Sequence, residues 1–265
     1  MMITNEYIPF ISKLTELIKH TDMEYTFRLT CKGKVKPGQF FEVSIPKYGE
    51  APISVSGVGD GTIDLTIHRV GTVTDEIFKR HVGDTFLLRG PYGNGFDLDL
   101  FRNKEIIVVA GGTGVAPIHG VVDYFAYHPE ECKKLTLIAG FRNPEETLFV
   151  EDLKRWQKTI NLIVTYDQAD ENSGYQVGLV TKYMPDLKID DIDNTEAIVV
   201  GPPIMIKFAA EALFNFDFPE EHIWISQSRK MCCGLGKCGH CKVGDVYICQ
   251  DGPVFNYTKG RTLID

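Results

Sequence analysis

The stretch Ile106-Ile-Val-Val-Ala-Gly-Gly-Thr-Gly-Val-Ala-Pro117 decides the fold of this chain. The apolar run Ile106–Ala110 predicts a strand that is buried on both faces, as in a parallel sheet. The glycines after it predict a tight turn, and Pro117 suits the first turn of a helix expected to run to about Tyr127. This order is typical of a nucleotide-binding α/β domain. Because the spacing is not G-x-G-x-x-G, the turn alone also fits any tight strand-to-helix connection.

The same pattern continues towards the C-terminus. Buried strands are expected at Leu135–Gly140, Leu162–Tyr166 and Ala197–Val200. Helix-length segments, Glu146–Thr159 and Pro203–Phe214, lie between or after them. Alternation of strands and helices predicts a doubly wound parallel sheet over residues 99–227.

Towards the N-terminus the pattern changes to short strands. Apolar residues alternate with polar ones over Ile63–Ile67, which predicts a strand with one buried face. Turn residues separate the short apolar runs, and this arrangement predicts a small antiparallel barrel over residues 1–98. The other runs that support it are Tyr25–Leu29, Gln39–Ile45 and Thr85–Leu88.

Composition excludes several classes of protein. Among 265 residues, 28 Lys and Arg stand against 36 Asp and Glu, for a net charge of −8, so nucleic-acid binding is not expected. No apolar run reaches the about 18 residues that suggest a membrane span. Polar Asn5 and Glu6 follow Met1–Thr4, without the basic and apolar regions of a signal peptide. We therefore expect a cytoplasmic protein.

The cysteines give the sharpest signal. Cys233-x4-Cys238-x2-Cys241, with seven residues between Cys241 and Cys249, is the plant-type ligand spacing of a [2Fe–2S] cluster. A four-cysteine zinc site and a redox dithiol at Cys238 and Cys241 are the alternatives, although zinc sites usually use two short C-x2-C pairs. Cys232 is an extra thiol, since using it as the first ligand would lengthen the first gap to five residues.

The surroundings of these cysteines fit a cluster. Gly234, Gly236 and Gly239 allow the loop to turn tightly and to direct backbone N–H groups at sulfur. From Ser228 onward there are six Lys or Arg and three Asp, a net charge of +3 that would offset a negatively charged cluster. A solvated basic patch is the alternative explanation of this charge.

Several motifs, taken in order, resemble the ferredoxin–NADP⁺ reductase superfamily. They are Ala51-Pro-Ile-Ser54, Val70-Gly-Thr-Val-Thr74, Arg89-Gly-Pro-Tyr-Gly-Asn-Gly-Phe96, Gly111–Pro117, Gly140-Phe-Arg142, Gly201-Pro-Pro-Ile-Met205 and the cysteine tail. The tail narrows the resemblance to the branch with a C-terminal [2Fe–2S] domain. That branch includes the electron-transfer subunits of anaerobic sulfite reductase and of dihydroorotate dehydrogenase, and the γ subunit of certain hydrogenases. The short gap between Cys241 and Cys249 most resembles the sulfite reductase branch.

The resemblance implies a multidomain chain of mixed α+β and α/β class. Its parts are an FAD-binding barrel over residues 1–98, an NAD(P)-binding α/β domain over 99–227 and a [2Fe–2S] domain over 228–265. It also implies a strand at Ile11–Ile18, where apolar residues have helical spacing.

The implied function is that of an oxidoreductase subunit. It would move electrons from NADH, with NADPH as the alternative donor, through FAD and the [2Fe–2S] cluster to a catalytic partner. The expected partners are the catalytic and iron–sulfur subunits of anaerobic sulfite reductase, which forms sulfide from sulfite. Alternatives are the same module serving dihydroorotate dehydrogenase or a cytosolic hydrogenase and, more distantly, a zinc-stapled module that senses nucleotides. Hydride transfer of this kind needs no general acid or base, so we expect no catalytic side chain.

The resemblance also carries over site residues. The cluster ligands would be Cys233, Cys238, Cys241 and Cys249. The flavin site would contain Pro52, Ile53, Ser54, Ile67, His68, Arg69, Gly71, Thr72, Val73 and Thr74. The nicotinamide site would contain Gly111, Gly112, Thr113, Gly114, Val115, Pro117, Gly140, Arg142, Gly201, Pro202 and Met205.

One position departs from the family pattern. The usual R-x-aromatic-S reads Ala51-Pro-Ile-Ser54 here, so the guanidinium that commonly holds phosphate is missing. Arg69 follows a neighbouring predicted strand, and we expect it to compensate.

Overall fold

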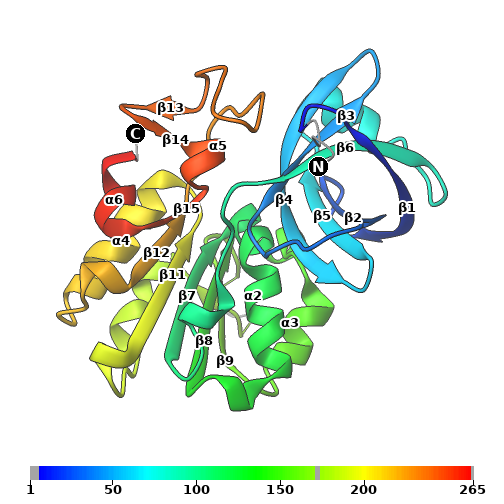
Figure 1. Cartoon of the computed structure of the whole chain (residues 1–265). Helices are drawn as coiled ribbons and strands as arrows, with labels where there is room; N and C mark the ends of the chain where they lie inside the picture. The colour runs from blue at the N-terminus through cyan, green and yellow to red at the C-terminus, as the bar shows by residue number, and fades with distance from the viewer. Residues whose placement is uncertain (1–5, 171–173, 264–265) are drawn as a thin grey trace. The chain divides into compact units, whose positions relative to one another are not determined.

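A computed structural model describes residues 6–170 and 174–263, which fall into two compact units (Figure 1). The first unit contains the residues up to Phe96 together with Ser228–Pro253, and the second contains Asp97–Gln227 and the chain from Val254 onward. The expected cluster segment 228–265 is thus shared between the units, and the three-domain division stays a prediction. Met1–Thr4, whose sequence predicts the absence of a signal peptide, lie outside the described residues.

The first unit contains a closed barrel of six antiparallel strands, as predicted. Its interior is filled by apolar side chains from all six strands, with Ile63, Leu65 and Ile67 each at most 1% exposed. In spatial order the strands are β1 (Phe10–Lys19), β2 (Glu24–Thr30), β5 (Thr62–His68), β4 (Gly49–Gly59), β3 (Phe40–Ile45) and β6 (Thr85–Tyr92).

Strand β1 explains the ambiguous helical spacing of its sequence. Its pairing with β2 shifts register between Leu14 and Glu16. A β-bulge adds one residue to the strand and moves the inward face by one position. Leu14 and Leu17 therefore both contact the barrel core, while Ile11 is 72% exposed. The predicted strand is confirmed, and the bulge is the reason for its irregular pattern.

A seven-stranded sheet forms the second unit. All neighbouring pairs are parallel except the last, where β15 adds antiparallel to β12. The chain builds outward from β7 on one side and from β11 on the other, so the order reverses between these two central strands. In spatial order the strands are β10 (Gln176–Val177), β9 (Asn161–Tyr166), β8 (Lys134–Phe141), β7 (Glu105–Gly111), β11 (Thr195–Val200), β12 (Ile223–Ser226) and β15 (Val254–Asn256).

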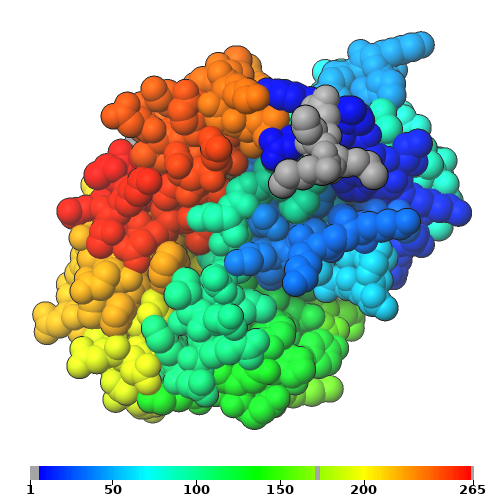
Figure 2. All heavy atoms as spheres, viewed as in Figure 1, coloured from blue at the N-terminus to red at the C-terminus, as the bar shows by residue number. Residues whose placement is uncertain are grey.

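The helices follow the predicted alternation. Only the segment Glu146–Thr159 differs, because its helix begins at Val150, after Leu148 and Phe149 have entered the core. In Figure 2 the red atoms of the last described residues lie beside yellow atoms of the second unit, to which they belong. The rings of Phe214 and Tyr257 in this unit are 6.1 Å apart. The helices are α1 (Thr72–Ile77), α2 (Val115–Tyr127), α3 (Val150–Trp156), α4 (Pro203–Phe214), α5 (Ile248–Asp251) and α6 (Tyr257–Gly260).

The cysteine-bearing part of the first unit contains little regular structure. It has the two-residue strands β13 (Lys242–Val243) and β14 (Val246–Tyr247), followed by α5. Among the described residues, no helix has the length and hydropathy that crossing a membrane requires.

Candidate functional site

The four predicted cluster ligands lie in two pairs. The Cys233 thiol interacts with the Cys238 thiol, and the Cys249 thiol interacts with the Cys241 thiol. All four are described, and no three of these sulfurs lie within 4.8 Å of one another. A tetrahedral zinc ion at about 2.3 Å from each sulfur would hold all four within about 3.8 Å of one another. The paired arrangement therefore suits a group with two metal atoms.

Backbone N–H groups of the glycine-rich loop point at these sulfurs. Leu235 N–H lies 3.4 Å from the Cys233 sulfur, and Gly236 N–H lies 3.3 Å from the Cys249 sulfur. Gly236 has a φ of 64°, and a Cβ there would lie 2.2 Å from a Gln250 oxygen. Only glycine fits this turn, so the loop is shaped to donate hydrogen bonds to thiolates or to a cluster.

The two pairs differ in electrostatics. Burial opposes ionisation of Cys233, but backbone N–H groups of Leu235, Lys237 and Cys238 lower its pKa to about 6. Burial, together with the thiol of its pair, raises the pKa of Cys249 to about 12. Because metal binding requires thiolates, Cys233 is a predicted ligand whose deprotonated form the surrounding backbone favours.

The predicted flavin residues lie on β4, β5 and the start of α1. Pro52–Ser54 are half-buried on β4, where they pair with β3. The side chain of Ile67 points into the barrel core, whereas His68 is exposed and is paired with Glu24. Ile67 can therefore face a flavin only through its backbone.

The turn before α1 is open and rich in N–H donors. The Thr74 hydroxyl accepts hydrogen bonds from Val70 N–H and Gly71 N–H, at 2.9 and 3.0 Å. Thr72, Val73 and Thr74 are the first residues of the helix, so their own N–H groups have no carbonyl one turn earlier. Nothing lies within 4 Å of a Cβ built on Gly71. This turn fits the predicted pyrophosphate cradle.

Arg69 stands beside this turn. Its Nε lies 2.7 Å from an Asp75 oxygen in the first turn of α1, and its guanidinium carbon lies 5.9 Å from the centre of the Phe78 ring. Ala51 pairs with Val43 in the barrel and supplies no charge. Arg69 is therefore placed at the turn, but with a carboxylate partner that a phosphate would have to share.

The predicted nicotinamide residues meet at one edge of the sheet. Ala110 pairs with Val200, and Gly111 pairs with Gly140, so the turns after β7, β8 and β11 are neighbours. This edge is the carboxyl end of the strands at the point where strand order reverses, and nucleotides bind there in open α/β sheets.

Glycines allow the close approach at this edge. Gly112 has a φ of 55° and open space around it, whereas a Cβ on Gly114 would lie 2.5 Å from the Val200 carbonyl oxygen. The Met205 sulfur would lie 2.5 Å from a Cβ on Gly111, and the Met205 methyl carbon 2.5 Å from one on Gly201. The remaining predicted residues differ in exposure: Thr113, Arg142 and Pro202 are exposed, Pro117 is half-buried and Val115 is buried.

A polar network that the sequence pattern does not reveal lies beside the cysteine loop. Arg89 is 6% exposed, pairs with Glu50 and donates to the Cys233 carbonyl at 3.1 Å. The only signal in the sequence was the Arg89–Phe96 motif, to which no role was assigned. Its first residue thus reaches the loop that carries the predicted ligands.

Glu42 lies within electrostatic reach of this network but forms no hydrogen bond with it. Its side chain is fully buried on β3, and neither carboxylate oxygen has a hydrogen-bond partner among the described residues. Burial raises the pKa of Glu42 to about 7, and the charges of Glu50 and Cys233 act in the same direction, while Arg89 opposes them. Glu42 is therefore close to half protonated at neutral pH.

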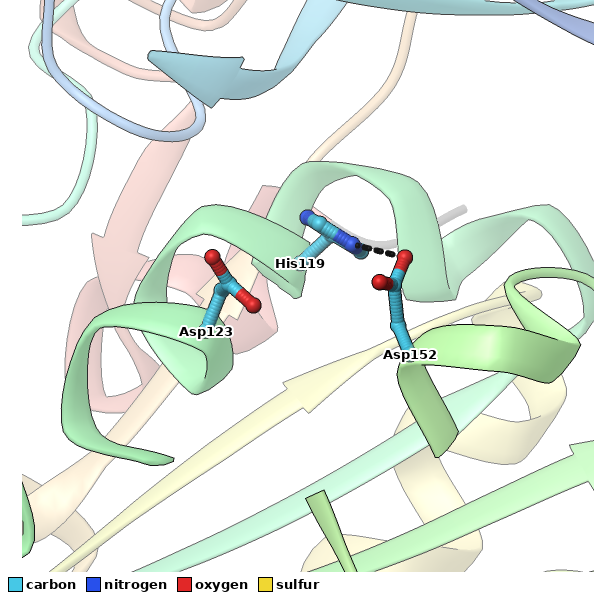
Figure 3. Close-up of side chains that lie close together, drawn as sticks. All are labelled: His119, Asp123 and Asp152. Carbon is cyan, nitrogen blue, oxygen red and sulfur yellow. Dashed lines mark hydrogen bonds and ion pairs between the residues drawn. The ribbon is translucent and has the colours of Figure 1, made fainter. Parts of the chain in front are cut away.

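A second polar cluster lies between α2 and α3. His119 points at Asp152, with 2.8 Å between Nε2 and Oδ2, and Asp123 lies beside them (Figure 3). Arg155 Nη2 is 2.7 Å from both Asp123 and Asp152, and the Trp156 indole also donates to Asp123. Because Arg155 contacts both carboxylates and His119 contacts Asp152, these polar contacts account for the cluster as a link between the two helices.

Comparison with known proteins agrees with this geometry. Residues 108–211 match the oxidoreductase NAD-binding domain, and residues 228–259 match the iron–sulfur cluster binding domain of dihydroorotate dehydrogenase B. The chain is 34% identical to the γ subunit of sulfhydrogenase 1 from Pyrococcus furiosus, over 91% of this chain and 87% of the relative. It is 32% identical to the probable electron transfer subunit of dihydroorotate dehydrogenase B (NAD(+)) from the same organism, over 90% and 85%.

A solved structure extends the likeness to the whole fold. A chain in the structure of an NADH-dependent reduced ferredoxin–NADP oxidoreductase matches with a TM-score of 0.78 and 25% identity, over 98% of this chain and 91% of the other. The two sequence relatives exceed 30% identity over most of their length. The chain therefore belongs to the ferredoxin–NADP⁺ reductase superfamily, in the oxidoreductase family of NAD-binding, iron–sulfur electron-transfer subunits that includes the sulfhydrogenase γ subunits and those of dihydroorotate dehydrogenase B.

Proposed function

We propose that this chain is the electron-transfer subunit of a hydrogenase-type complex and uses NADH, FAD and a [2Fe–2S] cluster. The observation that carries the proposal is the paired arrangement of four cysteines on a chain that is 34% identical to a sulfhydrogenase γ subunit. When bound, flavin accepts two electrons together and releases them singly, which suits a one-electron cluster. The reaction of the final substrate belongs to a separate catalytic subunit.

The chain's own residues bind and orient these groups. Cys233 and Cys238 would hold one iron, and Cys241 and Cys249 the other. The half-buried Pro52–Ser54 segment would line the flavin ring, with the Ser54 hydroxyl near its reactive nitrogen. The N–H groups at the start of α1 would bind the FAD pyrophosphate. The turns after β7, β8 and β11 would hold the dinucleotide, which requires glycine where the backbone approaches phosphate.

Arg69 is expected to strengthen FAD binding. Arg69→Ala removes a positive charge beside the pyrophosphate turn, and a charged hydrogen bond contributes about 1.5–3 kcal/mol, so the Kd for FAD should rise at least about tenfold. Titration of the deflavinated chain with FAD, followed by flavin fluorescence, measures this. Lys79→Ala, which removes a charge paired with Glu76 just after the same helix, is the control. Equal affinity of Arg69→Ala and the unmodified chain would show that Arg69 does not replace the missing arginine at Ala51.

Asp167 is expected to favour NADH over NADPH. It follows β9 directly, and its N–H donates to the Phe141 carbonyl at the carboxyl edge of the sheet. A carboxylate there would accept the ribose 2′-hydroxyl and repel a 2′-phosphate. Asp167→Asn should raise the NADPH-to-NADH ratio of kcat/KM about tenfold, which corresponds to the loss of about 1.4 kcal/mol of charge–charge interaction. Asp193→Asn removes an exposed carboxylate that precedes β11, at the opposite edge, and should leave the ratio unchanged.

The catalytic partner is tested on the native complex. We expect an affinity-tagged chain, purified without oxygen, to bring down hydrogenase-type subunits and to reduce NAD⁺ with hydrogen. Reduction of NAD⁺ with dihydroorotate would instead support the second candidate, which rests on the match of residues 228–259. NADH-dependent sulfite reduction would restore the partner predicted from the cysteine spacing. The relatives described above favour the two alternatives over sulfite reductase.

A cytoplasmic location is part of this proposal. Seven cysteines, all present as free thiols, suit a reducing compartment in which four of them bind a cluster. A preparation that contains zinc, but no iron or flavin, would overturn the proposal as a whole.

A further inference from the structure

The Arg89 side chain joins two segments of the first unit that are far apart in sequence. From β6 its Nε and Nη2 atoms reach the two carboxylate oxygens of Glu50, at 2.9 and 2.6 Å. This is a two-pronged pair, the strongest geometry available to arginine and a carboxylate. Glu50 lies on β4, immediately before the segment Ala51–Ser54.

The remaining donors of Arg89 point at the cysteine loop. Nη1 donates to the Tyr92 hydroxyl at 3.0 Å and to the Cys233 carbonyl at 3.1 Å, and Nη2 donates to the Cys232 carbonyl at 3.4 Å. A guanidinium has five N–H groups, and these contacts use all of them. Lysine has three donors and no planar fork, so it could not make the same set.

Tyr92 supports the same loop by packing. A Cβ on Gly234 would lie 2.4 Å from the Tyr92 ring, so the backbone of the loop lies directly against the ring. The guanidinium carbon of Arg89 is 5.7 Å from the centre of that ring. The hydrogen bonds of Arg89 and the ring of Tyr92 together fix the backbone at residues 232–234, next to the first predicted ligand.

The charge of Arg89 matters as much as its geometry. The potential of an iron–sulfur cluster depends on net charge, on hydrogen bonds and on solvent exposure. A buried positive charge favours the reduced cluster, which carries one more negative charge. Glu50 lies beside this guanidinium and has the opposite sign. Removing the charge of Arg89 should therefore lower the reduction potential, and removing the charge of Glu50 should raise it.

We propose that Arg89 is a positioning residue for the iron–sulfur loop. Arg89 holds Cys233 in place through the backbone, and its charge raises the reduction potential of the cluster. This inference rests on the proposed function, because it requires Cys233 to be a ligand. It goes further because it identifies Arg89 as the residue that links β4, which carries the predicted flavin segment, to the loop that carries the predicted cluster ligands.

The test is a redox titration of the purified, cluster-loaded chain followed by electron paramagnetic resonance. Arg89→Met should lower the equilibrium constant for one-electron reduction about tenfold, which corresponds to about 59 mV. Glu50→Gln should shift the same potential upward. The control is Arg28→Met, since Arg28 forms a similar two-pronged pair with Asp64, at 2.8 Å for both contacts, and lies on β2. It should leave the potential unchanged.

The outcomes separate this inference from the proposed function. Unchanged potentials in Arg89→Met and Glu50→Gln, or shifts of the same sign, would overturn the inference. If Arg89→Met does not fold, Glu50→Gln and Arg89→Lys decide: Arg89→Lys keeps the charge and should stay near the unmodified potential, yet should retain less iron. Retention of the full iron content by Cys233→Ser would instead overturn Cys233 as a ligand, and the proposed function's cluster assignment with it.

Discussion

Cys233→Ser is expected to reduce the iron and sulfide content of the purified chain by at least about tenfold, since even the loss of a supporting contact costs 10–100-fold in metal affinity. Serine is a poor ligand for iron because it offers a hard hydroxyl in place of a soft thiolate. Reduction of an artificial dye by NADH should persist, because the predicted nucleotide residues lie on β4, β5, α1 and the second unit. Iron and sulfide assays, with dye reduction measured in parallel, check both parts.

Cys232→Ser is the matched control, one residue away. Cys232 is exposed, and although the charge of Cys238 acts on it, the thiol that forms a hydrogen bond with Cys238 is that of Cys233. Its removal should leave iron content and spectrum unchanged. If Cys232→Ser lost the cluster and Cys233→Ser kept it, the first ligand would be Cys232, and the plant-type spacing would not apply.

Glu42→Gln is expected to stabilise the barrel at alkaline pH. The pKa of Glu42 is raised from 4.5 to about 7 in the folded chain, chiefly by burial. A raised carboxyl pKa means that its contribution to stability is fully present below about pH 4.5 and is lost as pH rises through 7. At 1.36 kcal/mol per pKa unit, the ionised carboxyl costs about 3 kcal/mol above pH 8. Glutamine keeps the shape without the charge, so it should recover roughly this amount.

Hydrogen exchange of peptides from β3 and β6, measured between pH 5 and 8.5, reports on this unit alone. The free energies of opening of the two proteins should differ little near pH 5, diverge as the pH rises towards 7 and differ by a nearly constant amount above pH 8. Glu16→Gln, which removes an exposed carboxylate on β1, should follow the unmodified chain at every pH. A constant difference between Glu42→Gln and the unmodified chain would contradict a proton on Glu42.

Strands and helices that show a regular apolar pattern over neighbouring residues could be predicted from the sequence. The predicted strand Ile106–Ala110 lies within the central strand β7, which is one residue longer at each end, and α4 has the predicted bounds Pro203–Phe214. Burial on both faces and helix-length apolar spacing are visible in sequence. β1 needed the family resemblance, since its bulge breaks the alternation that identifies strands. The start of α3 was misjudged because Phe149 adopts a φ of 56° just before it, a backbone choice set by packing.

The candidate site shows the same limit. The spacing of four cysteines is local and was sufficient to nominate the cluster loop. The contact between Arg89 and Cys233 joins residues 144 positions apart, and no periodicity reports it. Glu42 is equally hidden, because a glutamate between apolar residues on a strand reads as solvent-exposed. Charged groups buried by distant segments are the part of this site that only the fold reveals.

The pairing of β15 with β12 changes how the cysteine segment should be regarded. Ser226 and Val254 face each other in that antiparallel pair, so the chain leaves and rejoins the sheet at points only about 5 Å apart. The segment between them is an insertion in a sheet connection and not a C-terminal appendage. The segment could therefore be deleted and β12 joined to β15 by a hairpin turn. A simple truncation before Val254 would instead strip away β15 and leave β12 as a bare edge, open to aggregation.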